Sequence, residues 1–290
     1  MTQVDYLAPT NPDEAAKALL AGGPAARAMS GGTDLLVQLR SGRLKPGLIV
    51  DLKRVAGAMG IRREEAGFVI GAATPGAVVG EHAALGAAWP GVVEAAMLIG
   101  STQIQGRASM AGNLCNASPA ADSVPALLAA GATCVIVGAQ GRRTAGVESI
   151  GVGPGRTSLA PGEFVLELRL PPRPRGAADA YLRSIPRTEM DIAVVGVGAN
   201  LTVDAQGVIT AARLALGAVA PTVILCQAGA DAIIGSTLDE AALARLDSAV
   251  RAACKPISDK RGTAEFRTKI AGVLARRTAQ IAYGRAKERA

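Results

Sequence analysis

The spacing of hydrophobic and polar positions divides the first fifty residues into short helices and strands. Apolar residues recur at helical spacing over 12–20 and 35–39, whereas the runs at 27–29 and 48–52 are typical of strands. An Asn-Pro-Asp-Glu sequence at residue 11 predicts the start of the first helix, and a Gly-Gly pair at residue 22 predicts its end. This order indicates a small α/β unit.

Residues 68–172 have the pattern of a second, larger α+β domain. Strands are expected at 68–71, 133–137 and 164–170, and helices at 124–130 and from near Thr74 and Pro90. The run Pro-Pro-Arg-Pro-Arg-Gly at 171–176 is interpreted as a linker, because proline fits neither a helix interior nor a central strand.

Beyond the linker, two long apolar runs precede two helical patterns. We expect strands at 192–203 and 208–217, joined by a hairpin turn at 204–207, and amphipathic helices at 238–253 and 263–289. The fold class is therefore α+β. The expected domains are 1–57, 58–176 and 177–290, the last being an antiparallel sheet packed with helices.

Composition and charge argue against nucleic-acid binding. The net charge is +7, with +2 in residues 1–145 and +5 in 146–290, but only seven residues are aromatic. The basic residues lack interleaved aromatic side chains on which bases would stack. A basic surface that meets an acidic partner protein is the better interpretation.

The cysteines and the single histidine exclude several kinds of site. Cys115, Cys134, Cys226 and Cys254 form no CxxC pair, so neither a zinc site nor an iron-sulfur cluster is expected. One histidine, His82, cannot support a hydrolase triad or a His-rich metal site, and we interpret it as a helix-end residue. Reduced cysteines, no signal sequence and no apolar span of about 20 residues predict a cytoplasmic protein.

The sequence Ser-Gly-Gly-Thr-Asp at 30–34 lies between an expected strand and an expected helix. Consecutive glycines let a ligand approach the backbone, and a helix N-terminus offers free N–H groups to an anion. The alternative is a tight turn in which Thr33 or Asp34 caps the helix.

Residues 99–122 are rich in Gly, Ser, Asn and Asp and have neither helical nor strand periodicity. Ordering such a stretch requires partners for its backbone groups, which a cofactor could supply. A long surface loop is the alternative.

The Ser-Gly-Gly-Thr-Asp segment, followed by Gln103-Ile104, by Ser-Met-Ala-Gly-Asn at 109–113 and by Ser-Pro-Ala-Ala-Asp at 118–122, resembles a known family. These residues are similar to motifs of the medium, FAD-binding subunit of molybdenum hydroxylases, the carbon monoxide and xanthine dehydrogenase relatives. The resemblance extends to Tyr181-Leu182-Arg183 and to 190–193. It implies a two-part PCMH-type FAD-binding region followed by a flavoprotein C-terminal domain.

The resemblance also implies a set of FAD contacts. Backbone groups of 30–35 and 109–113 would hold the pyrophosphate, and Asp122 would bind on the ribityl or phosphate side. Ile99 and Leu166 would lie against the isoalloxazine. Arg183 occupies a position near the flavin where relatives often carry Lys. Ala111 departs from a family glycine and Met110 from Ile or Leu, and the alanine is tolerable if its φ is negative. The full set is Met29, Ser30, Gly31, Gly32, Thr33, Asp34, Leu35, Ile99, Gln103, Ile104, Ser109, Met110, Ala111, Gly112, Asn113, Asp122, Leu166 and Arg183.

The function implied is electron transfer and involves no catalytic side chain of this chain. A small subunit would carry the iron-sulfur clusters and a large subunit the molybdopterin cofactor and substrate site, as a dimer of heterotrimers. This chain would pass electrons through FAD to an external acceptor. The alternatives are a cofactor-free structural subunit on the same fold and a free-standing FAD oxidoreductase. Glu189 and Asp191 form a carboxylate pair, for which strand alternation and a salt bridge to Arg187 or Arg183 are the simpler explanation.

Overall fold

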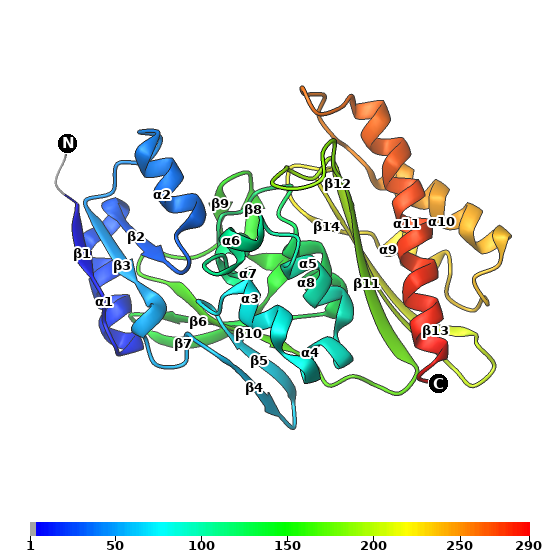
Figure 1. Cartoon of the computed structure of the whole chain (residues 1–290), viewed down its shortest axis with the longest axis horizontal. Helices are drawn as coiled ribbons and strands as arrows, with labels where there is room; N and C mark the ends of the chain where they lie inside the picture. The colour runs from blue at the N-terminus through cyan, green and yellow to red at the C-terminus, as the bar shows by residue number, and fades with distance from the viewer. Residues whose placement is uncertain (1–3) are drawn as a thin grey trace.

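The structure, a computed structural model, describes residues 4–290 and begins with a small parallel sheet. Strands β1 (Asp5–Leu7), β3 (Leu48–Asp51) and β2 (Ala26–Met29) lie in that order. Helix α1 (Pro12–Gly22) is capped by the Asn11 side chain, which accepts a hydrogen bond from the N–H of Asp13. A 3₁₀ turn (Gly23–Ala25) leads into β2, and α2 (Thr33–Arg40) leads away from it (Figure 1).

A five-stranded antiparallel sheet forms the middle of the molecule. Its strand order is β4 (Ile61–Glu64), β5 (Gly67–Gly71), β10 (Phe164–Leu170), β6 (Thr133–Gly138) and β7 (Gly141–Gly146). A 3₁₀ turn, η2 (Leu52–Arg54), follows β3 in the first part. The remaining elements of the middle part are α3 (Gly76–Glu81), α4 (Ala83–Ala88), α5 (Pro90–Ala96), α6 (Thr102–Gln105), α7 (Met110–Cys115), α8 (Ser123–Ala130), η3 (Val147–Ser149) and a two-stranded sheet of β8 (Gly151–Gly153) and β9 (Arg156–Thr157).

The last part is a four-stranded antiparallel sheet in the order β11 (Ala177–Ser184), β12 (Val195–Val203), β13 (Ile209–Gly217) and β14 (Ile224–Leu225). At the β12–β13 turn the Asp204 carboxylate accepts hydrogen bonds from the N–H groups of Gln206 and Val208. Helices α9 (Gln227–Asp231), α10 (Glu240–Ala253) and α11 (Ala264–Lys287) follow, and α11 packs along β11 and β12 (Figure 1).

Helix α8 joins the middle part to the last one. All eight of its residues are buried, and it packs against α5 as well as β11, β12 and β13. The backbone approach is close, since a Cβ added to Gly198 of β12 would lie 2.5 Å from the carbonyl oxygen of Pro125. A helix that is apolar on every side is typical of a core element.

A buried polar network also connects these two parts. The Arg173 guanidinium lies 3.6 Å from the centroid of the Trp89 ring, pairs with Asp179 and donates to the carbonyl of Ala88. The other Asp179 oxygen accepts from the N–H of Val92, in the first turn of α5. Burial lowers the pKa of Arg173 to about 10, so this arginine is charged at neutral pH.

The structure confirms most of the expected elements and corrects others. The segment 99–122, expected to lack periodic structure, contains the short helices α6 and α7. The strand expected from residue 192 begins at Val195, so the Glu189–Asp191 region is a loop, not an alternating strand. His82 lies between α3 and α4, and its Nδ1 accepts from the N–H of Leu85, which caps α4.

Replacing Arg173 by Met is expected to lower the free energy of unfolding by about 3–5 kcal/mol, because Asp179 would remain buried without its charged partner. Urea unfolding of the full chain measures this change. Arg175→Met is the matched control, since Arg175 is exposed and donates to the carbonyl of Ala290; it should change stability by less than about 0.5 kcal/mol. Equal effects of the two substitutions would contradict the role given to Arg173.

Candidate cofactor-binding site

The first glycine segment lies where the parallel sheet meets α2. Met29 ends β2 opposite Asp51 of β3, and α2 begins at Thr33. Gly32 occupies the cap position with a φ of 79°, a left-handed conformation that favours glycine. No side chain caps α2, so the alternative of a Thr33 or Asp34 cap is wrong. The N–H groups of its first turn have no partners within the helix and can bind an anion.

The second segment forms the start of α7. The Ser109 hydroxyl accepts from the N–H of Gly112 at 3.1 Å, and Asn113 Oδ1 accepts from the N–H and hydroxyl of Ser123 at 3.1 and 2.8 Å. Ala111 is helical, and its φ is not positive, so the condition for tolerating alanine here is met. Met110 and Ala111 are buried, which leaves the backbone of Gly112 and Asn113 as the partly exposed side of the segment.

The segments 30–35 and 109–113 lie close to each other although 73 residues separate them in the sequence. A Cβ on Gly31 would lie 1.8 Å from the carbonyl oxygen of Arg107, so glycine is required for this contact. A Cβ on Gly112 would lie 3.8 Å from the Cβ of Ser30, and Gln38 Nε2 donates to Asn116 Oδ1 at 3.0 Å. In Figure 1 the loop that precedes α2 faces α6 and α7. The contact creates one backbone-lined cradle from 30–35 and 109–113.

Asp122 and Arg183 are brought together as a buried ion pair. Arg183 donates to Asp122 at 2.8 Å, and the Tyr181 hydroxyl donates to the other Asp122 oxygen at 3.1 Å. Burial raises the pKa of Asp122, an effect opposed by Arg183 and Tyr181. Ser123, bonded to Asn113, places the pair beside the second segment.

The structure places the other expected residues as follows. Gln103 and Ile104 form part of α6, and the Ser101 hydroxyl donates to Gln103 at 2.8 Å. Ile99 is half-buried just before this helix. Leu166 lies at a bulge of β10 and is 2% exposed, in the same buried cluster as residues of α1. Its contact with an isoalloxazine stays a prediction. Asp191 pairs with Arg187 at 3.1 Å.

One residue of this region was missed by sequence reasoning. Lys53 donates from its Nζ to the carbonyl of Ser30 at 3.2 Å and pairs with Asp51 at 2.8 Å. Nothing in the linear sequence distinguishes it from the other surface lysines, because the contact with Ser30 depends on the pairing of β2 with β3.

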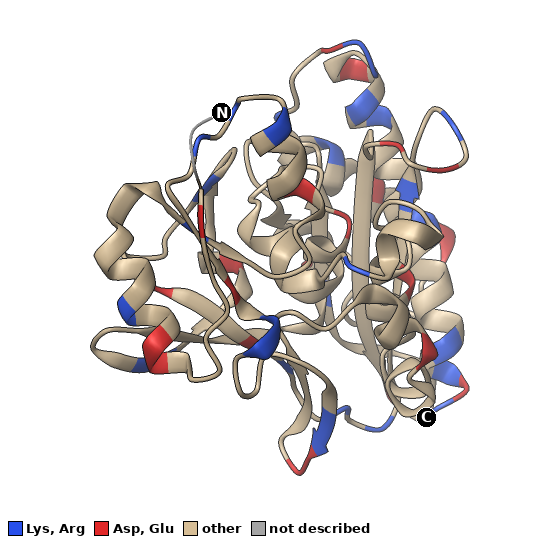
Figure 2. Cartoon of the chain, turned by 60° about the vertical axis from the view of Figure 1, so that its left-hand side comes forward, with Lys and Arg blue, Asp and Glu red and all other residues tan. Residues whose placement is uncertain are grey.

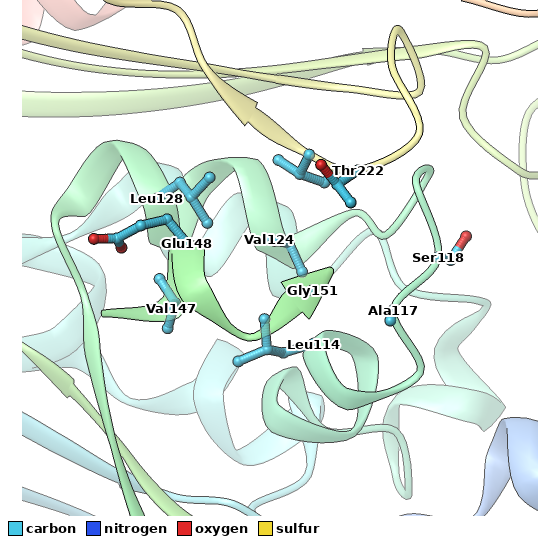
Figure 3. Close-up of a pocket in the computed structure, with 10 residues that line it drawn as sticks. Leu114, Ala117, Ser118, Val124, Leu128, Val147, Glu148, Gly151 and Thr222 are labelled. Carbon is cyan, nitrogen blue, oxygen red and sulfur yellow. The ribbon is translucent and has the colours of Figure 1, made fainter. Parts of the chain in front are cut away.

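A small pocket elsewhere is not part of this cradle. Figure 3 shows it between α7, α8, β8 and the loop before β14, lined mainly by apolar residues such as Leu114, Val124 and Leu128. Its volume of about 20 Å³ would admit roughly one water molecule. We assign it no function.

Residues 4–290 contain neither a metal-binding cluster nor a membrane-spanning helix. Within residues 4–290, no three His, Cys, Asp or Glu side chains are grouped so as to hold a metal ion. No helix in the same range is both long and apolar enough to cross a membrane. Lys and Arg are spread over several elements and interspersed with Asp and Glu (Figure 2).

Two family models account for nearly the whole chain. The model described as the FAD binding domain in molybdopterin dehydrogenase matches residues 2–173, and the CO dehydrogenase flavoprotein C-terminal domain matches residues 180–282. The chain belongs to this flavoprotein family. It is an oxidoreductase component whose cofactor is FAD.

Individual relatives of the flavoprotein agree with the family models. The carbon monoxide dehydrogenase medium chain of Afipia carboxidovorans is 32% identical over 288 residues, with 98% of each chain covered. The xanthine dehydrogenase FAD-binding subunit of Escherichia coli O157:H7 is 32% identical, with 86% of each covered. A chain of the reconstituted CO dehydrogenase from Oligotropha carboxidovorans has a TM-score of 0.93 at 31% identity, with 99% of each covered.

The cradle of this flavoprotein fits the diphosphate of FAD. An uncapped helix N-terminus and a backbone approach without Cβ atoms offer N–H donors to an anion at close range. The segments 30–35 and 109–113 would hold the diphosphate, as the resemblance implies.

Gly31→Ala is expected to destabilise the flavoprotein by about 1–3 kcal/mol and to reduce its FAD content, because the new Cβ forces the Arg107 backbone away. Urea unfolding of the apoprotein and the flavin content after reconstitution measure the two effects. Gly284→Ala in α11 is the control: outside the neighbouring helix backbone, no atom lies within 4 Å of its added Cβ, and this variant should be about 0.5–1 kcal/mol more stable. Wild-type behaviour of Gly31→Ala would show that the close approach is dispensable.

Proposed function

We propose that this chain is the FAD-binding electron-transfer subunit of a heteromeric molybdenum-containing hydroxylase or dehydrogenase. It would receive electrons from iron-sulfur clusters of a small partner subunit and pass them to an external acceptor. A large partner subunit would hold the molybdopterin cofactor and oxidise the substrate. The observation that supports this proposal most strongly is the single cradle built by two distant glycine segments, in a chain whose relatives are named as medium or FAD-binding subunits.

The chain's own residues bind and orient the cofactor in this proposal. Backbone groups of segments 30–35 and 109–113 would hold the diphosphate. The free N–H donors are those of the first turn of α2, because the N–H groups of Gly112 and Asn113 already donate to Ser109. Asp122 is fixed by Tyr181 and Arg183, so this carboxylate and guanidinium would form a preorganised wall beside the cofactor. Bound FAD supplies the redox chemistry, which no protein side chain provides. Ile99, Gln103 and Ile104 would contact the cofactor from the α6 side, and Leu166 from the β10 side.

We further propose the division into domains 1–57, 58–176 and 177–290. The three larger sheets support it, because each lies within one of these ranges. The proposed assembly is a dimer of heterotrimers in the cytoplasm. The ordinary helical backbone of Ala111 gives no support to a cofactor-free subunit, the alternative that this residue had suggested.

Expression of the chain alone and together with its partner subunits tests the proposal. We expect about one FAD per chain in both preparations, with iron and molybdenum in the co-purified complex alone. Absorbance spectra, released flavin and metal analysis give these quantities. An organic substrate should reduce the flavin of the complex and leave that of the isolated chain oxidised. Absence of flavin from both preparations would refute the FAD role, and rapid reduction of the isolated chain would indicate a free-standing oxidoreductase.

A further inference from the structure

A chain of polar contacts crosses the carboxyl end of the small parallel sheet. The Tyr6 hydroxyl on β1 donates to Asp51 Oδ2 at the end of β3. Asp51 Oδ1 accepts from the backbone N–H and the ammonium of Lys53, at 3.0 and 2.8 Å. The same ammonium donates to the Ser30 carbonyl at 3.2 Å, directly after β2. Ligands of open α/β sheets commonly bind at this edge.

Asp51 fixes the position of the lysine ammonium. The aspartate is 4% exposed, and this burial raises its pKa. The hydrogen bonds from Lys53 and Tyr6 together lower the pKa by more than burial raises it, so the pKa of Asp51 lies below its ordinary value. The carboxylate is therefore ionised at neutral pH and attracts the ammonium. A lysine is otherwise a flexible point charge, and this pairing orders it.

The ammonium retains one donor after these contacts. A lysine Nζ carries three N–H groups, of which one is directed to Asp51 and one to Ser30. The Lys53 side chain is 26% exposed, so the third donor can reach a ligand from the solvent side. The carbonyl it holds belongs to the residue immediately before Gly31 and Gly32, at the entrance to the uncapped N-terminus of α2.

We propose that Lys53 is a cofactor-binding residue: its ammonium fixes the Ser30 carbonyl and donates its third hydrogen bond to the diphosphate of FAD. This inference rests on the proposed FAD-binding role. It adds to a backbone cradle a fixed positive charge that sequence motifs do not reveal. Tyr6 and Asp51 act as positioning residues, because they order the ammonium without reaching the ligand.

The test compares FAD affinities of the full-length apoprotein and its variants at several salt concentrations. Lys53→Met alone would leave Asp51 buried and unpaired, so the decisive variant is the double substitution Asp51→Asn with Lys53→Met, which removes both charges. We expect its FAD affinity to fall roughly 10- to 100-fold, as for loss of a charge-assisted hydrogen bond. Its affinity should also depend less on salt than that of the wild type.

Three further variants define the mechanism. Lys53→Arg keeps the positive charge, so its FAD affinity should remain much closer to that of the wild type than to that of the double variant. Tyr6→Phe keeps the ion pair and should weaken binding by less than about tenfold. Lys17→Met, an exposed lysine on α1 in the same part of the chain, is the matched control and should bind as the wild type does.

The outcomes separate this inference from the proposed function. Wild-type affinity and salt dependence in the double variant would overturn the role of Lys53 while leaving FAD binding intact; the lysine would then serve only to neutralise Asp51. Failure of the wild-type chain itself to bind FAD would overturn the proposed function. Unfolding of the apo variants in urea shows whether each one is folded when its affinity is measured.

Discussion

Close approach of backbone to backbone holds this protein together and depends on positions that lack a side chain. Gly31 lets the first cofactor segment contact the Arg107 carbonyl, and Gly198 lets β12 contact the start of α8. The chain has few aromatic residues, so it fills its interior mainly with Ala, Val and Leu. Small side chains allow short distances between elements, which compensates for the missing aromatic volume.

Arginines of the C-terminal part stabilise the ends of helices in the middle part. The guanidinium of Arg213 donates to the carbonyl of Leu128 near the end of α8, and Arg289 donates to the carbonyls of Ala87 and Ala88 at the end of α4. Cations at these positions satisfy free carbonyls and oppose the negative end of the helix dipole. Some of the arginines that give the chain its net positive charge thus bind carbonyl groups of the protein itself. This agrees with the sequence, whose basic residues lack the interleaved aromatic side chains expected of a nucleic-acid-binding surface.

Local signals in the sequence were sufficient to predict the longer helices, the inner strands and the cofactor family, whereas strands such as β1, β4, β7 and β11 were not expected. The Asn11 cap and the Asp204 turn depend on a few neighbouring residues, and both are present in the structure. The short helices α6 and α7 escaped prediction because four to six residues are too few to show a periodicity. Lys53 escaped because its partner, Ser30, becomes a neighbour through strand pairing alone. The ion pair of Asp122 with Arg183 likewise depends on the packing of α8 against β11, although both residues were expected near the cofactor.

The full burial of α8 has a consequence for how this protein can be divided. This helix packs against the C-terminal sheet on one side and against α5 and α7 of the middle part on the other, so neither part can cover it alone. A chain that ended at the proline linker would expose this apolar helix to water, which favours aggregation. The two segments matched by separate family models therefore share one buried interface. Recombination between related genes would preserve function most readily if it exchanged both segments together.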